Sequence, residues 1–300
     1  MAYTEPQRTA AQKVAERIGP YVREAVVQNE AGERGKLYNS EKTLATLALM
    51  PDYVIDAAEQ RIRKGIEDIN FDKLVLDKWG RKDVFTKRYV ETPEVIFYRA
   101  ALLIAKGLSS HEPSLNYEQT VQAMFEKLKN REIYPNTPYM ANGGNRLLSE
   151  RLKKGIAEHS EELRHAIPEL KLEDMITEAE QRAKVKEQLF ACFVLDIYDD
   201  RKSIFKTEAD AAEIQASVGG TGFNFSNLRP ANEMIHGTGG LTDGPISFMR
   251  MYSNSLGQTM NQGGKREGAN MFMLDWNHPD IMRFIYCKSK DGEIAAANIS

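Results

Sequence analysis

The segment Leu189-Phe-Ala-Cys-Phe-Val-Leu-Asp196 is a continuous apolar run that ends at an aspartate. It has the length of a strand, and a strand without polar alternation is typical of a parallel sheet that is covered on both faces. The sequence therefore predicts a buried strand here. Cys192, near its middle, is either a small core side chain, which is the commoner case, or a thiol at a strand end that faces a cleft.

Elements of two kinds alternate after this segment. The apolar patterns, caps and turn residues predict, in chain order, a helix over 199–217, a strand over 223–226, a helix over 243–260, a strand over 270–274, a helix over 277–286 and a strand over 294–299. Strands that alternate with helices indicate an α/β fold with parallel pairing.

Helices are predicted before the segment. Residues 5–29 have apolar positions at helical spacing, and Pro20 is expected to kink or break this helix. Thr92-Pro-Glu94 is typical of a helix start, because it combines a cap, a first-turn proline and a favourable charge. Asn116 is the expected cap of a helix that runs through Lys129.

The residue composition changes near residue 134, where residues typical of turns become frequent. A charged stretch rich in Glu, Lys and Leu follows at about 146–188. We therefore expect a helical N-terminal domain over 1–133 and an α/β domain over 134–300. The charged stretch is expected to be a helical insert, and a solvated helical hairpin is its simplest interpretation.

The composition is that of a globular protein. Of 300 residues, 42% are apolar and 28% are charged, and the formal net charge is −3. Such a chain has no general field that attracts nucleic acid or an anionic membrane, and no segment reaches the ~18 apolar residues of a membrane-spanning helix. Residues 1–20 lack the apolar core of a signal peptide. With only two cysteines, Cys192 and Cys287, a disulfide framework is not expected, and the sequence favours a cytoplasmic location.

Two glycine-rich segments are candidate ligand loops. Gly219-Gly-Thr-Gly222 could bring backbone N–H groups to an anion, or it could be a helix cap and tight turn. It lacks the third glycine of a dinucleotide fingerprint. Gly263-Gly-Lys-Arg-Glu-Gly268 lacks the Ser or Thr and the glycine spacing of a phosphate loop, so a basic solvent loop is its simplest interpretation.

Single polar side chains give weaker signals. Arg229 could bind a phosphate or form a surface ion pair. His278 is better explained by helix capping and packing than by metal binding, and no cluster has the spacing of zinc or iron ligands, so no metal site is predicted. The residues alone therefore indicate an α/β protein with glycine-rich ligand loops and one buried cysteine.

Six motifs occur in a fixed order along the chain. They are Pro135-Asn-Thr-Pro-Tyr-Met-Ala-Asn-Gly-Gly144, Ala191-Cys-Phe-Val-Leu195, Gly219-Gly-Thr-Gly-Phe-Asn-Phe-Ser-Asn-Leu-Arg-Pro230, Gly239-Gly240 with Asp243-Gly-Pro-Ile-Ser-Phe-Met249, Gln262-Gly-Gly-Lys-Arg-Glu-Gly-Ala-Asn270, and His278-Pro-Asp280. Together they resemble the large chains of ribonucleotide reductases, and the sequences of these motifs are most similar to those of the adenosylcobalamin-dependent class. The resemblance covers about 136–300. It implies a helical domain followed by the first half of a ten-stranded α/β barrel.

The resemblance implies roles for residues around the apolar segment. Cys192 matches one of two cysteines that become a disulfide as the ribose 2′ position is reduced. Thr137 and Ala191 match substrate-contacting positions. Gly219 and Gly220 match backbone that lies against the substrate.

A second nucleotide site is also implied by the resemblance. Asp199 and Arg229 match residues around a deoxynucleoside triphosphate effector, and His236 is a further candidate contact. Two effector loops are expected, over Asn227–Gly240 and Ser289–Asn298.

The activity that the resemblance implies is the reduction of ribonucleotides to deoxyribonucleotides for DNA synthesis, with adenosylcobalamin as cofactor and a thioredoxin-like reductant. A thiyl radical abstracts the 3′ hydrogen, the 2′ hydroxyl leaves as water, and two cysteines supply electrons. Helices over 202–217 and 246–261 match those that pair across the family's homodimer.

The chain also departs from the family. The radical cysteine, its neighbouring Asn and Glu, and the second redox cysteine have no match in these 300 residues, so the chain is expected to be inactive without a C-terminal part. Cys287 has no family counterpart and is expected to pack in the core. Two alternatives stay open: a non-catalytic nucleotide-binding regulatory protein derived from the reductase, and the large chain of a diiron-dependent reductase. Whether substrates are diphosphates or triphosphates also stays open.

Overall fold

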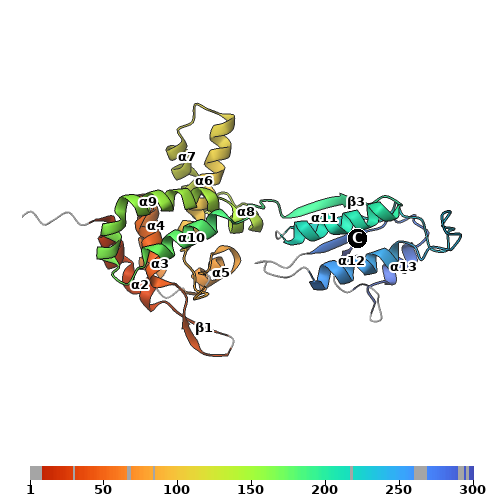
Figure 1. The fold of residues 1–300 in the computed structure, drawn as a ribbon, viewed down its shortest axis with the longest axis horizontal. Coiled ribbons are helices and arrows are strands. Elements are labelled where there is room, and N and C mark those ends of the chain that lie inside the picture. The colour runs from red at the N-terminus through yellow and green to blue at the C-terminus, as the bar shows by residue number, and fades with distance from the viewer. Residues whose placement is uncertain are drawn as a thin grey trace, which may run out of the picture. The chain divides into compact units, whose positions relative to one another are not determined.

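A computed structural model describes residues 9–29, 31–65, 69–83, 85–216, 219–259, 269–289, 294 and 297–300. The chain divides into two compact units, Met1–Leu189 and Phe190–Ser300 (Figure 1). Helices dominate the first unit, whereas helices alternate with parallel strands in the second. None of the described helices is both long and apolar enough to cross a membrane.

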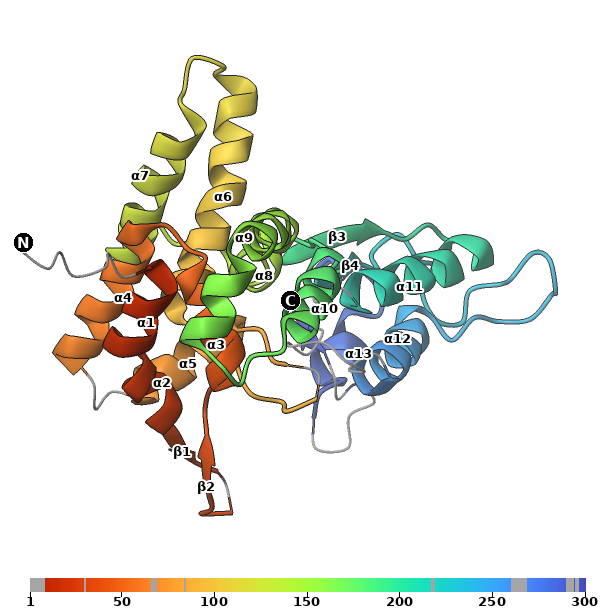
Figure 2. The ribbon, with the colours of Figure 1, turned by 60° about the vertical axis from the view of Figure 1, so that its left-hand side comes forward.

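The first unit is mainly helical. Its helices are α1 (Ala10–Arg17), α2 (Gly19–Glu24), α3 (Ser40–Ala48), α4 (Asp52–Gly65), α5 (Ile69–Trp79), α6 (Pro93–His111), α7 (Tyr117–Lys129), α8 (Thr137–Asn142), α9 (Asn145–Ala166) and α10 (Leu172–Ala183). Between α2 and α3, the short strands β1 (Val26–Gln28) and β2 (Arg34–Lys36) pair antiparallel. Helices α6 and α7 pack together as a hairpin that projects from the unit (Figure 2).

Local sequence signals place the starts of α6 and α7. α6 begins at Pro93 and α7 at Tyr117, as the sequence predicts. The side chain of Asn116 accepts a hydrogen bond from the N–H of Gln119 at 3.1 Å, which caps α7. Thr92 makes no side-chain capping bond, so Pro93, whose missing N–H costs little in a first turn, marks the start of α6.

One predicted helix is shorter than expected. The pattern over 5–29 breaks at Ile18, Pro20 lies in the first turn of α2, and the chain becomes extended at Val26. The break at the proline is confirmed. The helix expected beyond Glu24 is wrong, because the β-branched residues there pair with β2 instead.

The charged stretch at 146–188 forms α9 and α10, which pack against each other, so the expected helical hairpin is confirmed. It is not simply solvated, however. One stripe of each helix is buried in the core of the first unit, including Leu148, Leu152, Leu163, Met175 and Ala179. Because this core extends to α10, the compact unit ends at Leu189, whereas the sequence pattern places the domain boundary at 133. The assignment of residues 134–189 to a family domain stays a prediction.

Three completely buried charged side chains of the first unit form one network. Glu91 Oε1 accepts hydrogen bonds from Arg99 Nε at 3.1 Å and from Arg182 Nη1. Arg99 also donates to the carbonyl oxygens of Trp79 at 2.8 Å and Gly143 at 2.9 Å. Buried charges are tolerated when they are paired and hydrogen-bonded. This network therefore ties α6, α10 and the turn after α8 to one another.

The described part of the second unit contains a parallel sheet with strand order β3-β4-β5-β6, and helices connect its strands. Its elements are β3 (Cys192–Asp196), α11 (Arg201–Ala216), β4 (Gly220–Asn224), α12 (Pro245–Thr259), β5 (Asn270–Met273), α13 (Ile281–Tyr286) and β6 (Asn298–Ile299). The predicted alternation of helices and strands and their parallel pairing are both confirmed, so the fold class is α/β.

The core of the second unit lies on one face of this sheet. The ring centroids of Phe223 and Tyr252 are 5.0 Å apart, and those of Phe225 and Phe272 are 5.3 Å apart. α11 and α12 cover this face (Figure 2). Cys287 is 5% exposed and belongs to the same core, so its predicted packing role is confirmed.

The predicted burial of β3 on both faces is wrong. Val194 is 74% exposed and Cys192 is also exposed, while Phe193 and Leu195 are half-buried. The reason is positional: β3 is an edge strand of the described sheet, and the helices of this unit pack on the other face. A run of apolar residues alone does not say how many layers cover it.

Candidate functional site

The uncovered face of the sheet carries Cys192 beside the two glycines of β4, Gly220 and Gly222. In the parallel ladder Cys192 pairs with Gly220, and Val194 pairs with Gly222. A Cβ added at Gly220 would lie 3.8 Å from Cys192 Sγ and 3.4 Å from the carbonyl oxygen of Ala191. The thiol therefore borders bare backbone at the start of β3. The core-packing interpretation of Cys192 is wrong, because its side chain is exposed, whereas the alternative of a thiol that faces a cleft stays a prediction.

Gly219 to Gly222 is not the ligand loop that the sequence suggested, because Gly220, Thr221 and Gly222 lie within β4. The N–H of Gly220 donates to Ala191 O at 2.7 Å, and the N–H of Gly219 donates to Ile214 O at 3.1 Å. These donors are occupied within the sheet and the preceding turn, so they cannot hold an anion. Gly219 and Gly220 are buried and Gly222 is half-buried, so what these glycines provide is the absence of a side chain beside Cys192 and Val194.

A polar cluster lies beneath β4, and the sequence pattern did not reveal it. Gln215 Nε2 donates to Thr221 Oγ1 at 2.7 Å and to Asn270 Oδ1 at 2.6 Å, and Thr221 Oγ1 donates to Asn270 Oδ1 at 2.9 Å. All three side chains are buried. The only sequence signal was polar residues inside apolar patterns 55 positions apart. The cluster links α11, β4 and β5 directly below the glycine strand.

Asp199 and Arg229 meet beyond the carboxyl ends of β3 and β4. Arg229 Nε donates to Asp199 Oδ2 at 2.8 Å, and Arg229 Nη1 donates to the carbonyl oxygen of Met234 at 3.2 Å. Both side chains stay partly accessible, at 35% for Asp199 and 26% for Arg229. The prediction that one strand–helix–strand unit brings them to the same sheet end is confirmed. Whether the pair binds a nucleotide stays a prediction.

Asp280, the last residue of the motif His278-Pro-Asp280, anchors the loop that follows Arg229. Asp280 Oδ2 accepts a hydrogen bond from the N–H of Ala231 at 2.8 Å. Gly244, at φ +78°, passes so close that a Cβ there would lie 2.6 Å from the same oxygen. His236 lies exposed in this loop. The loop is therefore anchored at its base, while His236 is available at its tip.

His278 is a packing residue, as the sequence predicts. It is buried, its Nε2 lies 3.0 Å from the carbonyl oxygen of Leu228, and its Nδ1 accepts from the N–H of Asp280 at 3.1 Å. Both ring nitrogens are engaged, so neither is available as a ligand. Within the described ranges, no group of three or more His, Cys, Asp or Glu could hold a metal ion.

The remaining predicted site residues are less closely connected. Thr137, half-buried, opens α8 in the first unit, where Asn136 caps that helix by accepting from the N–H of Tyr139 at 2.9 Å. The segment Gly263–Gly268 and most of the second effector loop, Ser289–Asn298, lie outside the residues described.

Comparison with known proteins agrees with this arrangement. Residues 190–300 match the family described as ribonucleotide reductase, barrel domain. The vitamin B12-dependent ribonucleoside-diphosphate reductase of Thermoplasma acidophilum is 47% identical over 107 residues, which are 36% of this chain and 14% of that protein. The protein of the same name from Mycobacterium tuberculosis strain H37Rv is 32% identical over 214 residues, 71% of this chain and 24% of that protein.

A ribonucleoside-diphosphate reductase large subunit of vaccinia virus is 34% identical over 108 residues, 36% of this chain and 14% of that protein. The chain thus spans about a quarter or less of the length of the relatives that it matches. The matched family begins at residue 190, where the second compact unit also begins. Residues 190–300 therefore match the ribonucleotide reductase barrel-domain family, and up to 71% of the chain is similar to vitamin B12-dependent ribonucleoside-diphosphate reductases.

Proposed function

We propose that this chain is the N-terminal part of an adenosylcobalamin-dependent ribonucleotide reductase, which reduces ribonucleotides to deoxyribonucleotides. The observation that carries the proposal is the exposed thiol of Cys192 beside Gly220, a paired position that has no side chain. A ribose can approach a thiol only where no side chain intervenes, and the glycine provides that space.

Cys192 acts in this proposal as one of two reducing thiols. Its sulfur and a second cysteine thiol, which lies outside this chain, each lose one hydrogen and form a disulfide. The electron pair and the protons reduce the ribose 2′ carbon, and the 2′ hydroxyl leaves as water. A thioredoxin-like dithiol then reduces the disulfide and restores both thiols. Ala191 and Gly219 are proposed substrate contacts, and Thr137 stays a predicted one.

Adenosylcobalamin supplies the initiating radical when it is bound. The described residues contain no cluster that could ligate a metal, and no described side chain is assigned to the cofactor. Its contacts are expected in the C-terminal part. The residues of this chain bind and orient the ribonucleotide and supply one reducing thiol.

A deoxynucleoside triphosphate effector is proposed to bind near Asp199 and Arg229, with His236 as a further contact. Asp199 can accept a hydrogen bond from a ribose hydroxyl, and the guanidinium of Arg229 can pair with phosphate oxygens. The expected homodimer pairs through α11 and α12. A ligand that binds only the dimer must stabilise it.

The test compares the two cysteines of the chain in the presence of a complementing C-terminal part. Cys192→Ser should abolish turnover with a dithiol reductant and leave the melting temperature nearly unchanged, because this side chain is exposed. Cys287→Ser, in the core, should retain turnover and lower stability by ~1–3 kcal/mol through an unsatisfied hydroxyl. The chain alone, with adenosylcobalamin and a dithiol, should form no deoxynucleotide. Normal turnover of Cys192→Ser would remove Cys192 from the reaction.

A further inference from the structure

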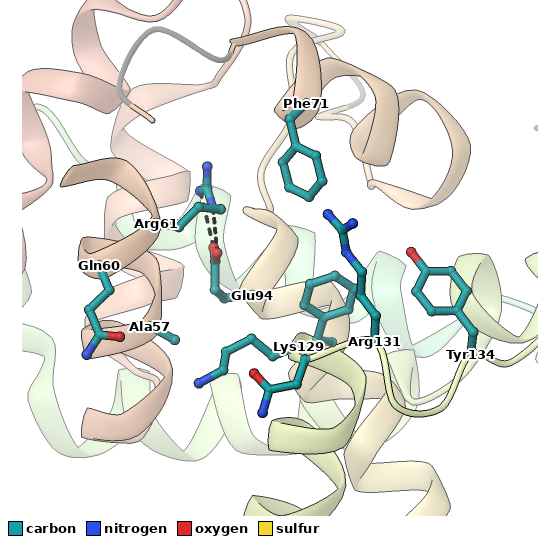
Figure 3. A pocket seen from close by; sticks show the side chains of 10 residues that line it. Ala57, Gln60, Arg61, Phe71, Glu94, Lys129, Arg131 and Tyr134 are labelled. Carbon is teal, nitrogen blue, oxygen red and sulfur yellow. Dashed lines mark hydrogen bonds and ion pairs between the residues drawn. The ribbon is translucent and has the colours of Figure 1, made fainter. Parts of the chain in front are cut away.

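The first unit contains a cleft of about 460 Å³ that the proposed reductase chemistry does not use. It lies between α4, α5, the start of α6 and the end of α7. Figure 3 shows the hydrogen bonds from Arg61 to Glu94 within it, and Phe71, Arg131 and Tyr134 along its wall. A volume of this order accommodates a ligand of nucleotide size.

Most charges around the cleft are already compensated. Arg61 donates to Glu94 Oε1 at 2.5 Å and Oε2 at 3.2 Å, and its other side pairs with buried Asp72. Burial lowers the pKa of Arg61, but these two carboxylates outweigh burial and hold the pKa well above its ordinary value, so Arg61 stays charged. Lys129 pairs with Glu126 at 2.5 Å. Neither cation is a free anion site by itself.

Arg131 differs from the other cations of the cleft. It has no carboxylate partner among the residues that the structure describes; its guanidinium carbon lies 5.7 Å from the ring centroid of Phe71. A positive charge held over an aromatic face, without an ion-pair partner, can bind a phosphate at the cost of solvent contacts only.

The backbone at Arg131 is unusual for an arginine. After α7 ends, the N–H of Glu132 donates to Lys127 O at 2.9 Å and the N–H of Arg131 donates to Leu128 O at 3.1 Å, which is the helix-ending motif that normally has glycine at this position. Arg131 adopts φ +63° there. A side chain that its own backbone disfavours, and that lines a cleft with no carboxylate partner in the described ranges, indicates a ligand-binding role rather than a structural one.

Flat apolar surface adjoins this charge. Phe71, Phe97 and Tyr134 all line the cleft. The ring of Tyr134 is half exposed and lies 5.4 Å from the ring of Trp79. Aromatic faces beside the guanidinium of Arg131 suit a ligand with one flat ring system and one anionic group.

We propose that this cleft binds a nucleoside phosphate, with the phosphate on Arg131 and the base against Phe71 and Tyr134. The site lies in the first unit, whereas the proposed effector residues Asp199 and Arg229 lie in the second. It is therefore a separate site, and it does not depend on the proposed reductase activity.

The test titrates the full chain with ADP, adenosine and inorganic phosphate in a Trp276→Phe background, where Trp79 is the one remaining tryptophan. ADP should quench Trp79 fluorescence, because the base stacks on the neighbouring Tyr134. ADP should also bind at least tenfold more tightly than adenosine or phosphate. Equal affinity for ADP and phosphate would show an anion site without a base, and would overturn the proposal.

Arg131→Gly is the decisive variant, because glycine suits the backbone at this position. It should keep or raise the melting temperature while it weakens ADP binding at least tenfold. Arg164→Ala removes an exposed charge outside the cleft and should leave ADP affinity unchanged. Arg229→Ala should also leave the Trp79 signal unchanged, which separates this site from the effector site. Unaltered ADP quenching in Arg131→Gly, or its loss in Arg229→Ala, would reject the cleft as the binding site.

Discussion

The two units of the chain differ in what their central elements bury and expose. The first unit buries charge: Glu91, Arg99 and Arg182 are each 0% exposed and pair with one another through the shared carboxylate. The second unit exposes apolar side chains: Val194 is 74% and Met271 38% exposed on the face of the sheet that bears Cys192. One unit thus has a closed core, and the other has an open sheet face.

This difference suits the first unit to a structural role and the second unit to a reactive surface. A buried ion network is costly unless every member is paired, so it specifies one arrangement of the helices around it. An open sheet face keeps the thiol of Cys192 accessible, which a substrate site needs. Four substitutions test how far this contrast holds, from the largest expected effect to the smallest.

Glu91→Leu should destabilise the first unit by about 5 kcal/mol, the upper end of the range for breaking a buried ion pair, because Arg99 and Arg182 both lose their shared carboxylate. Urea unfolding followed by Trp79 fluorescence in a Trp276→Phe background measures this unit. Glu150→Gln breaks only the exposed pair with Arg146 and should cost under ~1 kcal/mol. Similar losses in the two variants would show that the buried network is not special.

Phe223→Ala should cost the second unit about 4 kcal/mol, because its ring is completely buried among other aromatic rings. Val194→Ala, on the open face of the same sheet, should change stability by less than ~0.5 kcal/mol. Denaturant-dependent labelling of the buried Cys287 thiol, in a Cys192→Ser background, reports the unfolding of this unit. A comparable loss for Val194→Ala would mean that the face is covered in solution.

Asp83→Asn should cost about 2 kcal/mol at pH 7, because buried Lys42 loses its charged partner. Burial raises the pKa of Asp83, but hydrogen bonds from Lys42 and Thr86 outweigh burial, so the pKa lies below its ordinary value. The folded state therefore binds this proton more weakly than the unfolded state. Its stabilising contribution is complete above the ordinary carboxyl pKa of ~4 and is lost as pH falls through the folded value.

The stability of wild type should consequently fall more steeply below pH ~4 than that of Asp83→Asn. Urea unfolding of both proteins between neutral and acid pH measures the two slopes. Parallel curves would show that Asp83 titrates in the folded state as it does in the unfolded chain.

Arg229→Ala should weaken dATP binding about tenfold, or about 1.4 kcal/mol, in the enzyme completed by its C-terminal part. Calorimetry gives the affinity, and sedimentation shows whether dATP still promotes the dimer. His236→Ala should have a smaller effect, and Lys154→Ala, an exposed change on α9 of the first unit, should have none. Unchanged affinity in Arg229→Ala would reject the effector-site assignment.

Part of the candidate site is predictable from the sequence. Asp199 and Arg229 meet because a parallel strand–helix–strand unit returns the chain to the same sheet end. The alternation of strand and helix patterns that predicts this unit is visible in the sequence. The place of Gly219 to Gly222 could not be predicted, because loop and strand glycines look alike locally. The support from Gln215 and Asp280 was also hidden, since each bonds residues that are distant along the chain.

The sequence by itself determined the starts of α6 and α7, the parallel alternation after residue 190, and the resemblance of its motifs to ribonucleotide reductases. These depend on caps, proline geometry and residue order, which act over a few positions. Only the tertiary structure decided that Cys192 is exposed, that the charged hairpin α9–α10 belongs to a core, and that Arg131 faces a cleft. Burial depends on which layers come to lie over a segment, and no residue carries that information in its neighbours along the chain.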